Sequence, residues 1–92
     1  MTESRSRIEK IRQSIESMLT PDSLEIVDQS HRHAGHAGAR DGRGHFDVRI
    51  VSGAFRGKLP LARHRMVFAA VGNLMETDIH ALSIKALSPD EV

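Results

Sequence analysis

The spacing of apolar residues changes twice along the second half of the chain, and these changes restrict how its last strands can be connected. Residues 45–52 alternate between apolar and polar side chains, which predicts a half-buried strand. Residues 60–75 repeat apolar side chains at helical spacing, and residues 79–87 alternate again. A helix that connects two strands of one sheet makes those strands parallel. The sequence therefore predicts a strand–helix–strand crossover.

The first half of the chain contributes one helix and one strand. Apolar residues three and four apart predict an amphipathic helix that ends before Pro21, with a stripe made of Ile8, Ile11, Ile15, Met18 and Leu19. Residues 24–28 alternate as a short strand, whereas residues 29–44 have little apolar content and four glycines, typical of a long loop. The predicted fold is a single small α+β domain over residues 1–92. Its order is α-β-β-α-β, with a three-stranded mixed sheet packed by helices and the first two strands antiparallel.

Three local features qualify this prediction. Residues 1–5 and 88–92 are expected to be flexible. Ser88 and Pro89 begin a helix-start pattern, but only two acidic residues and a valine follow, so this helix can have one turn at most. Gly72 falls inside the second predicted helix, where glycine costs about 1 kcal/mol relative to alanine unless it allows a close approach to the sheet.

The composition excludes several classes of protein. The chain has no cysteine, so it cannot by itself form disulfides, thiolate nucleophiles or cysteine-ligated metal sites. Its three phenylalanines are its only aromatic residues besides histidine, which argues against a single-strand nucleic-acid binder that stacks bases. The longest apolar run, residues 66–71, is far shorter than the roughly 20 residues of a membrane helix. Without a secretory signal pattern at the N-terminus, the expected location is cytoplasmic.

Five of the six histidines belong to one end of the predicted sheet. The first strand ends there and the next two begin there, which brings together His31, His33, His36, His45 and His80. Imidazole is a good ligand for zinc, iron, copper and nickel, so this end is a candidate metal site. The loop histidines could equally be solvated, and His45 could support the strand edge and orient a ligand. The alternation places His80 on the same face as Leu82 and Ile84, where it could instead be a core histidine.

Positive charge is concentrated in the middle of the chain. No acidic residue occurs between residues 48 and 75, whereas the cations are Arg49, Arg56, Lys58, Arg63 and Arg65, with His64 beside them. Cations near a helix N-terminus oppose the helix dipole, so their presence there indicates an anionic partner. That partner could be a phosphate, a carboxylate-bearing peptide or an acidic protein surface, and the alternative is a solvated basic face. No catalytic set is recognisable, so the chain is not expected to be an enzyme.

Several segments together closely resemble the BolA-like family over residues 8–91. The two most specific are Arg63-His64-Arg65-Met66-Val67 and His80-Ala81-Leu82. The others are the run from Leu24 to Ser30, His33, Gly44-His45-Phe46, Val51-Ser52, Phe55-x-Gly57 and Leu61. The resemblance implies an α-β-β-α-β fold similar to the second type of KH domain, which agrees with the order predicted from periodicity.

The resemblance also implies a function. BolA-like proteins of the histidine-bearing branch are non-enzymatic partners of monothiol glutaredoxins, with which they share a glutathione-ligated [2Fe–2S] cluster. The glutaredoxin cysteine and glutathione hold one iron, and the BolA-like chain supplies the ligands of the other. Those ligands match His80 and, in the loop, His33, with His31, His36 and His45 as alternates. The basic residues would then face the glutathione carboxylates or acidic groups of the glutaredoxin.

Two further readings stay open. Some bacterial members are described as DNA-binding regulators of morphology and stress genes, and the basic stretch with a KH-like topology suits that role. The net charge of only +1, the few aromatic residues and the absence of a Gly-x-x-Gly clamp argue against it. An isolated zinc or iron site on this chain alone would need a third strong ligand from His36 or His45.

Overall fold

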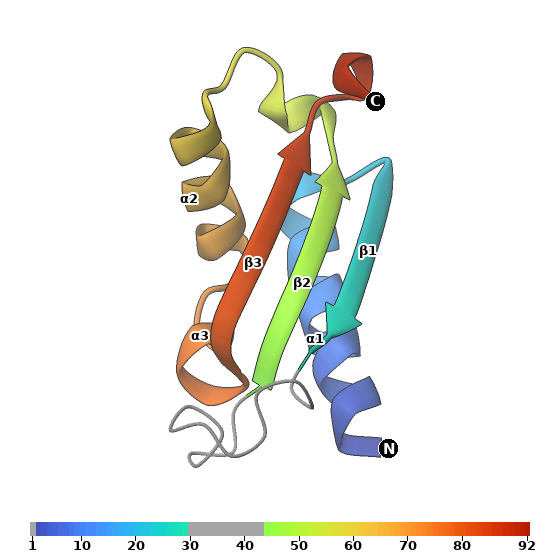
Figure 1. Cartoon of the computed structure of the whole chain (residues 1–92), viewed down its shortest axis with the longest axis vertical. Coiled ribbons are helices and arrows are strands. Elements are labelled where there is room, and N and C mark those ends of the chain that lie inside the picture. Colours follow the sequence, from blue (N-terminus) through green and yellow to red (C-terminus); the bar gives the residue numbers. More distant parts are fainter. Residues whose placement is uncertain (1, 30–43) are drawn as a thin grey trace.

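The computed structural model describes residues 2–29 and 44–92. The elements follow the predicted α-β-β-α-β order, with a short third helix before the last strand and two 3₁₀ turns (Figure 1). They are α1 (Thr2–Leu19), β1 (Ser23–Asp28), β2 (Gly44–Val51), η3 (Gly53–Phe55), α2 (Pro60–Val71), α3 (Leu74–Thr77), β3 (Ile79–Leu87) and η4 (Pro89–Glu91). Within the described ranges, no helix combines the length and the apolar character that a membrane span requires.

The three strands form one sheet in the order β1-β2-β3. β1 and β2 are antiparallel, with Leu24 opposite Ile50 and Ile26 opposite Val48. β2 and β3 are parallel, as the helical connection between them requires. The mixed sheet and both strand directions predicted from the sequence are therefore confirmed.

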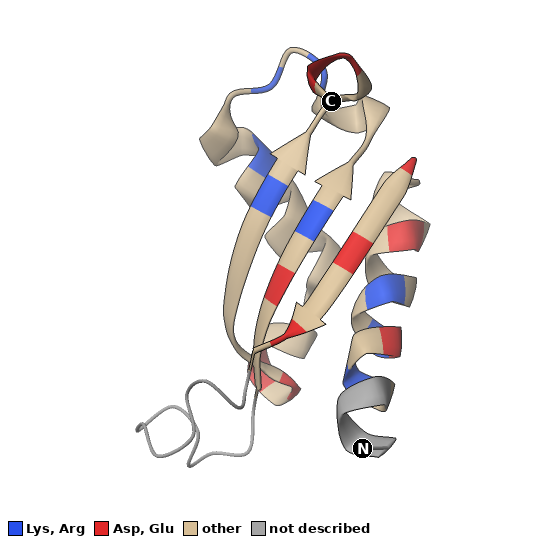
Figure 2. Ribbon diagram, turned by 45° about the vertical axis from the view of Figure 1, so that its right-hand side comes forward, with Lys and Arg blue, Asp and Glu red and all other residues tan. Residues whose placement is uncertain are grey.

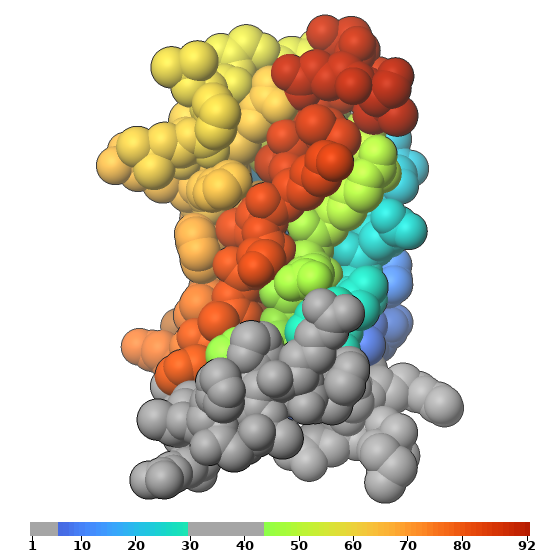
Figure 3. All heavy atoms as spheres, viewed as in Figure 1, coloured from blue at the N-terminus to red at the C-terminus, as the bar shows by residue number. Residues whose placement is uncertain are grey.

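Both long helices cover the same face of the sheet, which gives two layers (Figure 1). The core between them combines three rows of side chains, each spaced by the period of its own element. α1 contributes Ile11, Ile15 and Leu19, β2 contributes Phe46, Val48 and Ile50, and α2 contributes Val67, Ala70 and Val71. Among residues 2–29 and 44–92 no helix lies on the opposite face of the sheet, and side chains of all three strands are visible there in Figure 3.

Gly72 ends α2 earlier than the sequence predicts. The residue has a φ of 52°, in the left-handed region that glycine tolerates, and its N–H donates to the carbonyl of Phe68 at 3.0 Å. The chain then starts α3 at Leu74 instead of continuing one helix to residue 75. The glycine is thus a helix terminator and does not lie inside the helix.

The C-terminal residues 88–92, predicted to be flexible, are held against the body of the protein. Ser88 is buried, and its N–H donates a hydrogen bond to Glu91 Oε1 at 2.8 Å. Arg63 on α2 donates from Nη1 to Glu91 Oε1 at 2.6 Å and from Nη2 to Glu91 Oε2 at 3.1 Å. This two-point pairing fixes η4, the single turn that the helix-start pattern allows.

Removal of a core side chain from α1 should destabilise the fold far more than removal of an exposed one. Ile15 is fully buried, so Ile15→Ala should lower the free energy of unfolding by about 2–5 kcal/mol. Met18 lies on the same helix and is 60% exposed, so Met18→Ala should change it by about 0.5 kcal/mol or less. Urea unfolding followed by circular dichroism would measure both. Equal losses would contradict the assigned core face.

The contact of η4 with α2 should make stability depend on acid pH. The hydrogen bond from Arg63 lowers the pKa of Glu91 from 4.5 to about 2. A carboxyl group with a depressed folded pKa stabilises the fold fully above its unfolded pKa. That contribution is then lost as the pH falls from about 4.5 towards about 2.

The Glu91→Gln variant, which keeps the shape and loses the charge, tests this dependence. It should have a lower urea midpoint than the wild type at pH 7, and the difference should shrink steadily below about pH 4.5. Glu16→Gln, at an exposed position on α1, should match the wild type at each pH. A Glu91→Gln difference that stays constant down to pH 2 would show that the ion pair is not the cause.

Candidate functional site

His80 is presented to solvent by an irregularity where β2 and β3 begin to pair. Gly44 lies opposite Ile79, but His45 lies opposite Ala81, so β3 has one extra residue at this point. Such a bulge reverses the alternation of side chains along the strand. Ile79 consequently points into the core, His80 is exposed, and Leu82 and Ile84 pack against the core farther along. The predicted common face for His80, Leu82 and Ile84 is therefore wrong, and His80 is not a core histidine.

His45 lies directly beside His80. The centroids of the two imidazole rings are 5.1 Å apart, with their planes inclined by 47°. His45 is half-buried and its Nε2 atom is buried, whereas His80 is exposed. The sequence prediction that these two residues share one end of the sheet is confirmed. Their ring contact restricts the directions in which His80 can point.

Asp78 anchors the turn that precedes His80. Its carboxylate accepts hydrogen bonds from Thr77 Oγ1 at 2.6 Å and Lys10 Nζ at 3.2 Å, and Arg7 Nε lies 3.5 Å away. Its backbone carbonyl accepts the N–H of Gly44 at 2.9 Å. Burial alone would raise the pKa of Asp78, but the hydrogen bonds with Thr77 and Lys10 and the nearby positive charges keep that pKa below its ordinary value. α1 is thereby tied to the start of both β2 and β3.

Sequence reasoning missed the role of Asp78. Its hydrogen-bond partner on α1, Lys10, is 68 residues away along the chain. The only available signal was a pair of cations, Arg7 and Lys10, beside the apolar stripe of the first helix. Nothing in the spacing of these cations identifies Asp78 as the acid that they contact.

The loop histidines His31, His33 and His36 lie outside the described residues. The two ends of the connection are described, however, and both lie at the end of the sheet where β3 begins (Figure 1). Asp28 is opposite Phe46, and the N–H of Gln29 donates to the carbonyl of His45 at 2.7 Å. The connection that carries these histidines therefore leaves β1 and enters β2 beside His45.

The predicted basic surface is divided by the structure. Arg63 is only 9% exposed and belongs to the interior. It donates to the carbonyls of Lys58 at 2.8 Å and Ala86 at 3.0 Å, pairs with Glu91, and lies 6.0 Å from the ring centre of Phe55. As a result its pKa is raised, chiefly by the Glu91 hydrogen bond. These contacts engage four of the five N–H donors of its guanidinium, which leaves little of the group for an anionic partner.

The other basic residues lie away from His80. Arg56 is exposed but pairs with Asp90 at 3.4 Å, whereas Lys58 and Arg65 are exposed and His64 is half-buried. The contact between Arg63 and Ala86 places the start of α2 beside the end of β3, six residues from His80. Six residues of strand span about 20 Å. That the basic residues face the glutathione carboxylates or acidic groups of a glutaredoxin stays a prediction.

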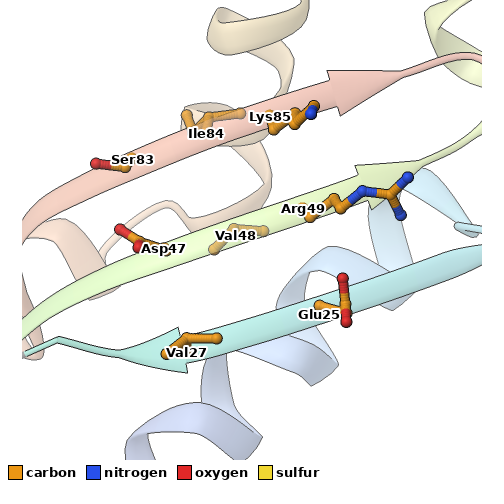
Figure 4. A pocket seen from close by; sticks show the side chains of 8 residues that line it. All are labelled: Glu25, Val27, Asp47, Val48, Arg49, Ser83, Ile84 and Lys85. Carbon is orange, nitrogen blue, oxygen red and sulfur yellow. The ribbon is translucent and has the colours of Figure 1, made fainter.

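The uncovered face of the sheet has a shallow hollow of about 380 Å³ (Figure 4). Acidic and basic side chains share it, and Figure 2 shows both signs of charge on the strands. Its lining consists of Glu25, Val27, Asp47, Val48, Arg49, Ser83, Ile84 and Lys85. Within the described residues, no group of three or more histidines, cysteines or acids is arranged to hold a metal ion.

Loss of the Asp78 carboxylate should loosen the end of the sheet that presents His80. Asp78→Asn should lower the urea midpoint and speed hydrogen exchange at the amides of residues 44 and 79–81, because α1 loses its ionic contact there. Glu76→Gln, at an exposed position in α3, should change neither quantity. Unchanged exchange in Asp78→Asn would show that the bulge is held without this carboxylate.

The chain matches a family model and several known proteins. The model, "BolA-like protein", matches residues 15–91. SufE-like protein 1 (chloroplastic/mitochondrial) of Arabidopsis thaliana is 45% identical, over 95% of this chain and 25% of that protein. BolA-like protein 1 of Mus musculus is 40% identical, over 86% of this chain and 56% of that one. The DNA-binding transcriptional regulator BolA of Escherichia coli (strain K12) is 37% identical, over 83% of this chain and 70% of that protein. The chain thus spans only part of several relatives.

Solved structures agree with the fold. The BolA domain of SufE1 from Arabidopsis thaliana superposes with a TM-score of 0.83 at 43% identity, covering 95% of this chain and 96% of that one. Yeast Fra2 gives a TM-score of 0.63 at 31% identity, covering 90% of this chain and 80% of that one. Family model, relatives and structures coincide over most of the sequence, and the chain belongs to the BolA-like family.

Proposed function

We propose that this protein binds a monothiol glutaredoxin and shares with it a glutathione-ligated [2Fe–2S] cluster, in iron–sulfur trafficking or iron homeostasis. The ligands from this chain are His80 and a histidine of the segment between β1 and β2, with His33 first and His31, His36 and His45 as alternates. The protein acts as a binding partner, in keeping with the non-enzymatic character of BolA-like proteins.

The exposed position of His80 is the observation that carries this proposal. A residue that binds a cluster shared with another protein must be accessible from solvent. The bulge turns His80 outward at the second residue of β3. The backbone just before His80 is anchored by buried Ile79 and by the ion pair of Asp78 with Lys10. His80 therefore combines an accessible imidazole with a fixed backbone, which favours ligand binding over a role in packing.

The donors available in the chain fit a shared cluster better than one held alone. Without cysteine the chain offers only imidazole nitrogens to a cluster, so the thiolates must come from elsewhere. When bound, the cluster would supply iron with mixed thiolate and imidazole ligation, which raises its reduction potential above that of an all-thiolate cluster. His45, in ring contact with His80, would orient that imidazole.

Substitution of His80 should abolish cluster sharing without unfolding the protein. We expect visible circular dichroism of a glutathione-bound [2Fe–2S] glutaredoxin dimer to change on titration with the wild type and to saturate at one to one. His80→Ala and His33→Ala should each prevent the new spectrum. His64→Ala, a histidine of α2 away from this end of the sheet, should retain it.

The outcomes separate the candidate ligands. If His80→Ala alone removes the spectrum, the second ligand is His31, His36 or His45, and each of these can be substituted in turn. A wild-type protein that leaves the spectrum of the glutaredoxin dimer unchanged would refute the proposal.

DNA binding is a second candidate, because the E. coli relative is named a DNA-binding transcriptional regulator. The basic residues that would support it are fewer than the sequence indicates. Arg63 is internal and Arg56 is paired with Asp90, which leaves Lys58, Arg65 and His64. So few phosphate contacts provide little of the electrostatic free energy on which such binding depends.

The cytoplasmic location stays a prediction, since one plant relative is named as chloroplastic/mitochondrial and another as chloroplastic.

A further inference from the structure

α2 exposes a stripe of side chains that the proposed function does not use. Leu61 is 63% exposed and Phe68 is 40% exposed, and Arg65 lies between them. These three residues, here called the α2 stripe, are four and three positions apart and therefore share one face of the helix. The buried residues of the same helix, including Val67 and Ala70, lie on the opposite face. The stripe is thus outside the core.

A second feature is the positive charge around the α2 stripe. Arg65 and Lys58 are exposed, and neither forms an ion pair with any residue that the structure describes. Lys58 lies just before the helix, next to Leu59, which is 77% exposed. No acidic residue occurs between positions 48 and 75 of the sequence. Exposed apolar side chains bordered by unpaired cations are complementary to an apolar surface bordered by acids.

α2 runs from the end of β3 back towards α3 and the start of β3, so the Leu61 end of the α2 stripe is the part that lies far from His80 (Figure 1). α2 starts beside the end of β3, where Arg63 contacts the carbonyl of Ala86. Leu61 therefore lies about a strand length, roughly 20 Å, from His80. A ligand held by the histidines would therefore not by itself reach Leu61.

We propose that the α2 stripe binds an amphipathic helix of a partner protein. The apolar face of that helix packs on Leu61 and Phe68, and its flanking acidic residues pair with Arg65 and Lys58. A row of side chains four and three apart forms a ridge that fits between the side chains of another helix. The inference is independent of cluster sharing, since it uses none of the histidines.

A nucleic acid fits this face less well than a protein helix does. Leu61 and Phe68 would bring apolar surface against a phosphate backbone, and only Arg65 and Lys58 remain available for phosphates. Arg63, the third cation of the stretch, is bound to Glu91. Exposed single apolar residues are ordinary on protein surfaces, but here two share a helix face with a cation between them.

A pair of designed peptides tests this inference on the full chain. One helical peptide has leucines along one face with glutamates beside them, and its matched control has lysines in place of the glutamates. We expect amide chemical shifts of residues 58–69 to change with the glutamate peptide and its affinity to fall with added salt. The lysine peptide should bind at least tenfold more weakly.

Variants of the α2 stripe make the test specific. Leu61→Ser and Phe68→Ser should each weaken glutamate-peptide binding at least tenfold, while the urea midpoint stays near that of the wild type, because both side chains are exposed. Arg65→Glu should reverse the preference, so that the lysine peptide binds more tightly. Ser83→Ala, on the uncovered sheet face, should have no effect.

Three results would overturn the inference. Shift changes could map to the hollow of the sheet face or to residues 79–81 instead of α2. Both peptides could bind equally in the wild type and in Arg65→Glu, which would remove the role of charge. A duplex DNA of 20 base pairs, titrated in parallel, could shift the α2 residues while neither peptide does, which would identify the face as a nucleic-acid surface.

Discussion

The parallel pairing of β2 with β3, offset by one residue at its start, is the interaction on which the functional geometry depends. Since Gly44 pairs with Ile79 and His45 with Ala81, the intervening His80 has no place in the regular alternation. Ile79, Leu82 and Ile84 all pack in the core while His80 faces solvent, whereas regular alternation would place His80 on the same face as Leu82 and Ile84. The one extra residue in β3 thus allows this end of the sheet to be packed while an imidazole is exposed beside His45.

Ion pairs connect a helix to each end of β3. At one end Asp78 joins Arg7 and Lys10 of α1 to the start of β3. At the other end Arg63 joins α2 to Glu91 and to the end of β3. Both carboxylates have lowered pKa values: at Asp78 the hydrogen bonds from Thr77 and Lys10 outweigh the effect of burial, and at Glu91 the hydrogen bond from Arg63 is the chief cause. Each pairing ties a helix to β3, so the strand is held along its length between two helices.

The sequence was sufficient for the order of elements and insufficient for the details at their boundaries. Periodicity identified the strands because the residues that face the core alternate without interruption, as Phe46, Val48 and Ile50 do. It assigned His80 to the wrong face because a bulge is a property of the pairing with β2, which no single strand reveals. Arg63 looked like a surface cation for a similar reason. Its partner, Glu91, lies 28 residues away in a tail that composition alone suggested to be flexible.

The internal position of Arg63 also changes what the basic stretch can mean. A run of three basic residues on a helix necessarily points in different directions, since successive side chains are about 100° apart. Arg63 turns inward to Glu91, while Arg65 turns outward between Leu61 and Phe68. One of the two arginines therefore stabilises the fold, and the other is available to a partner. The same three-residue pattern contains a structural ion pair and an exposed recognition residue, so charge counted along the sequence overstates the charge that a ligand can contact.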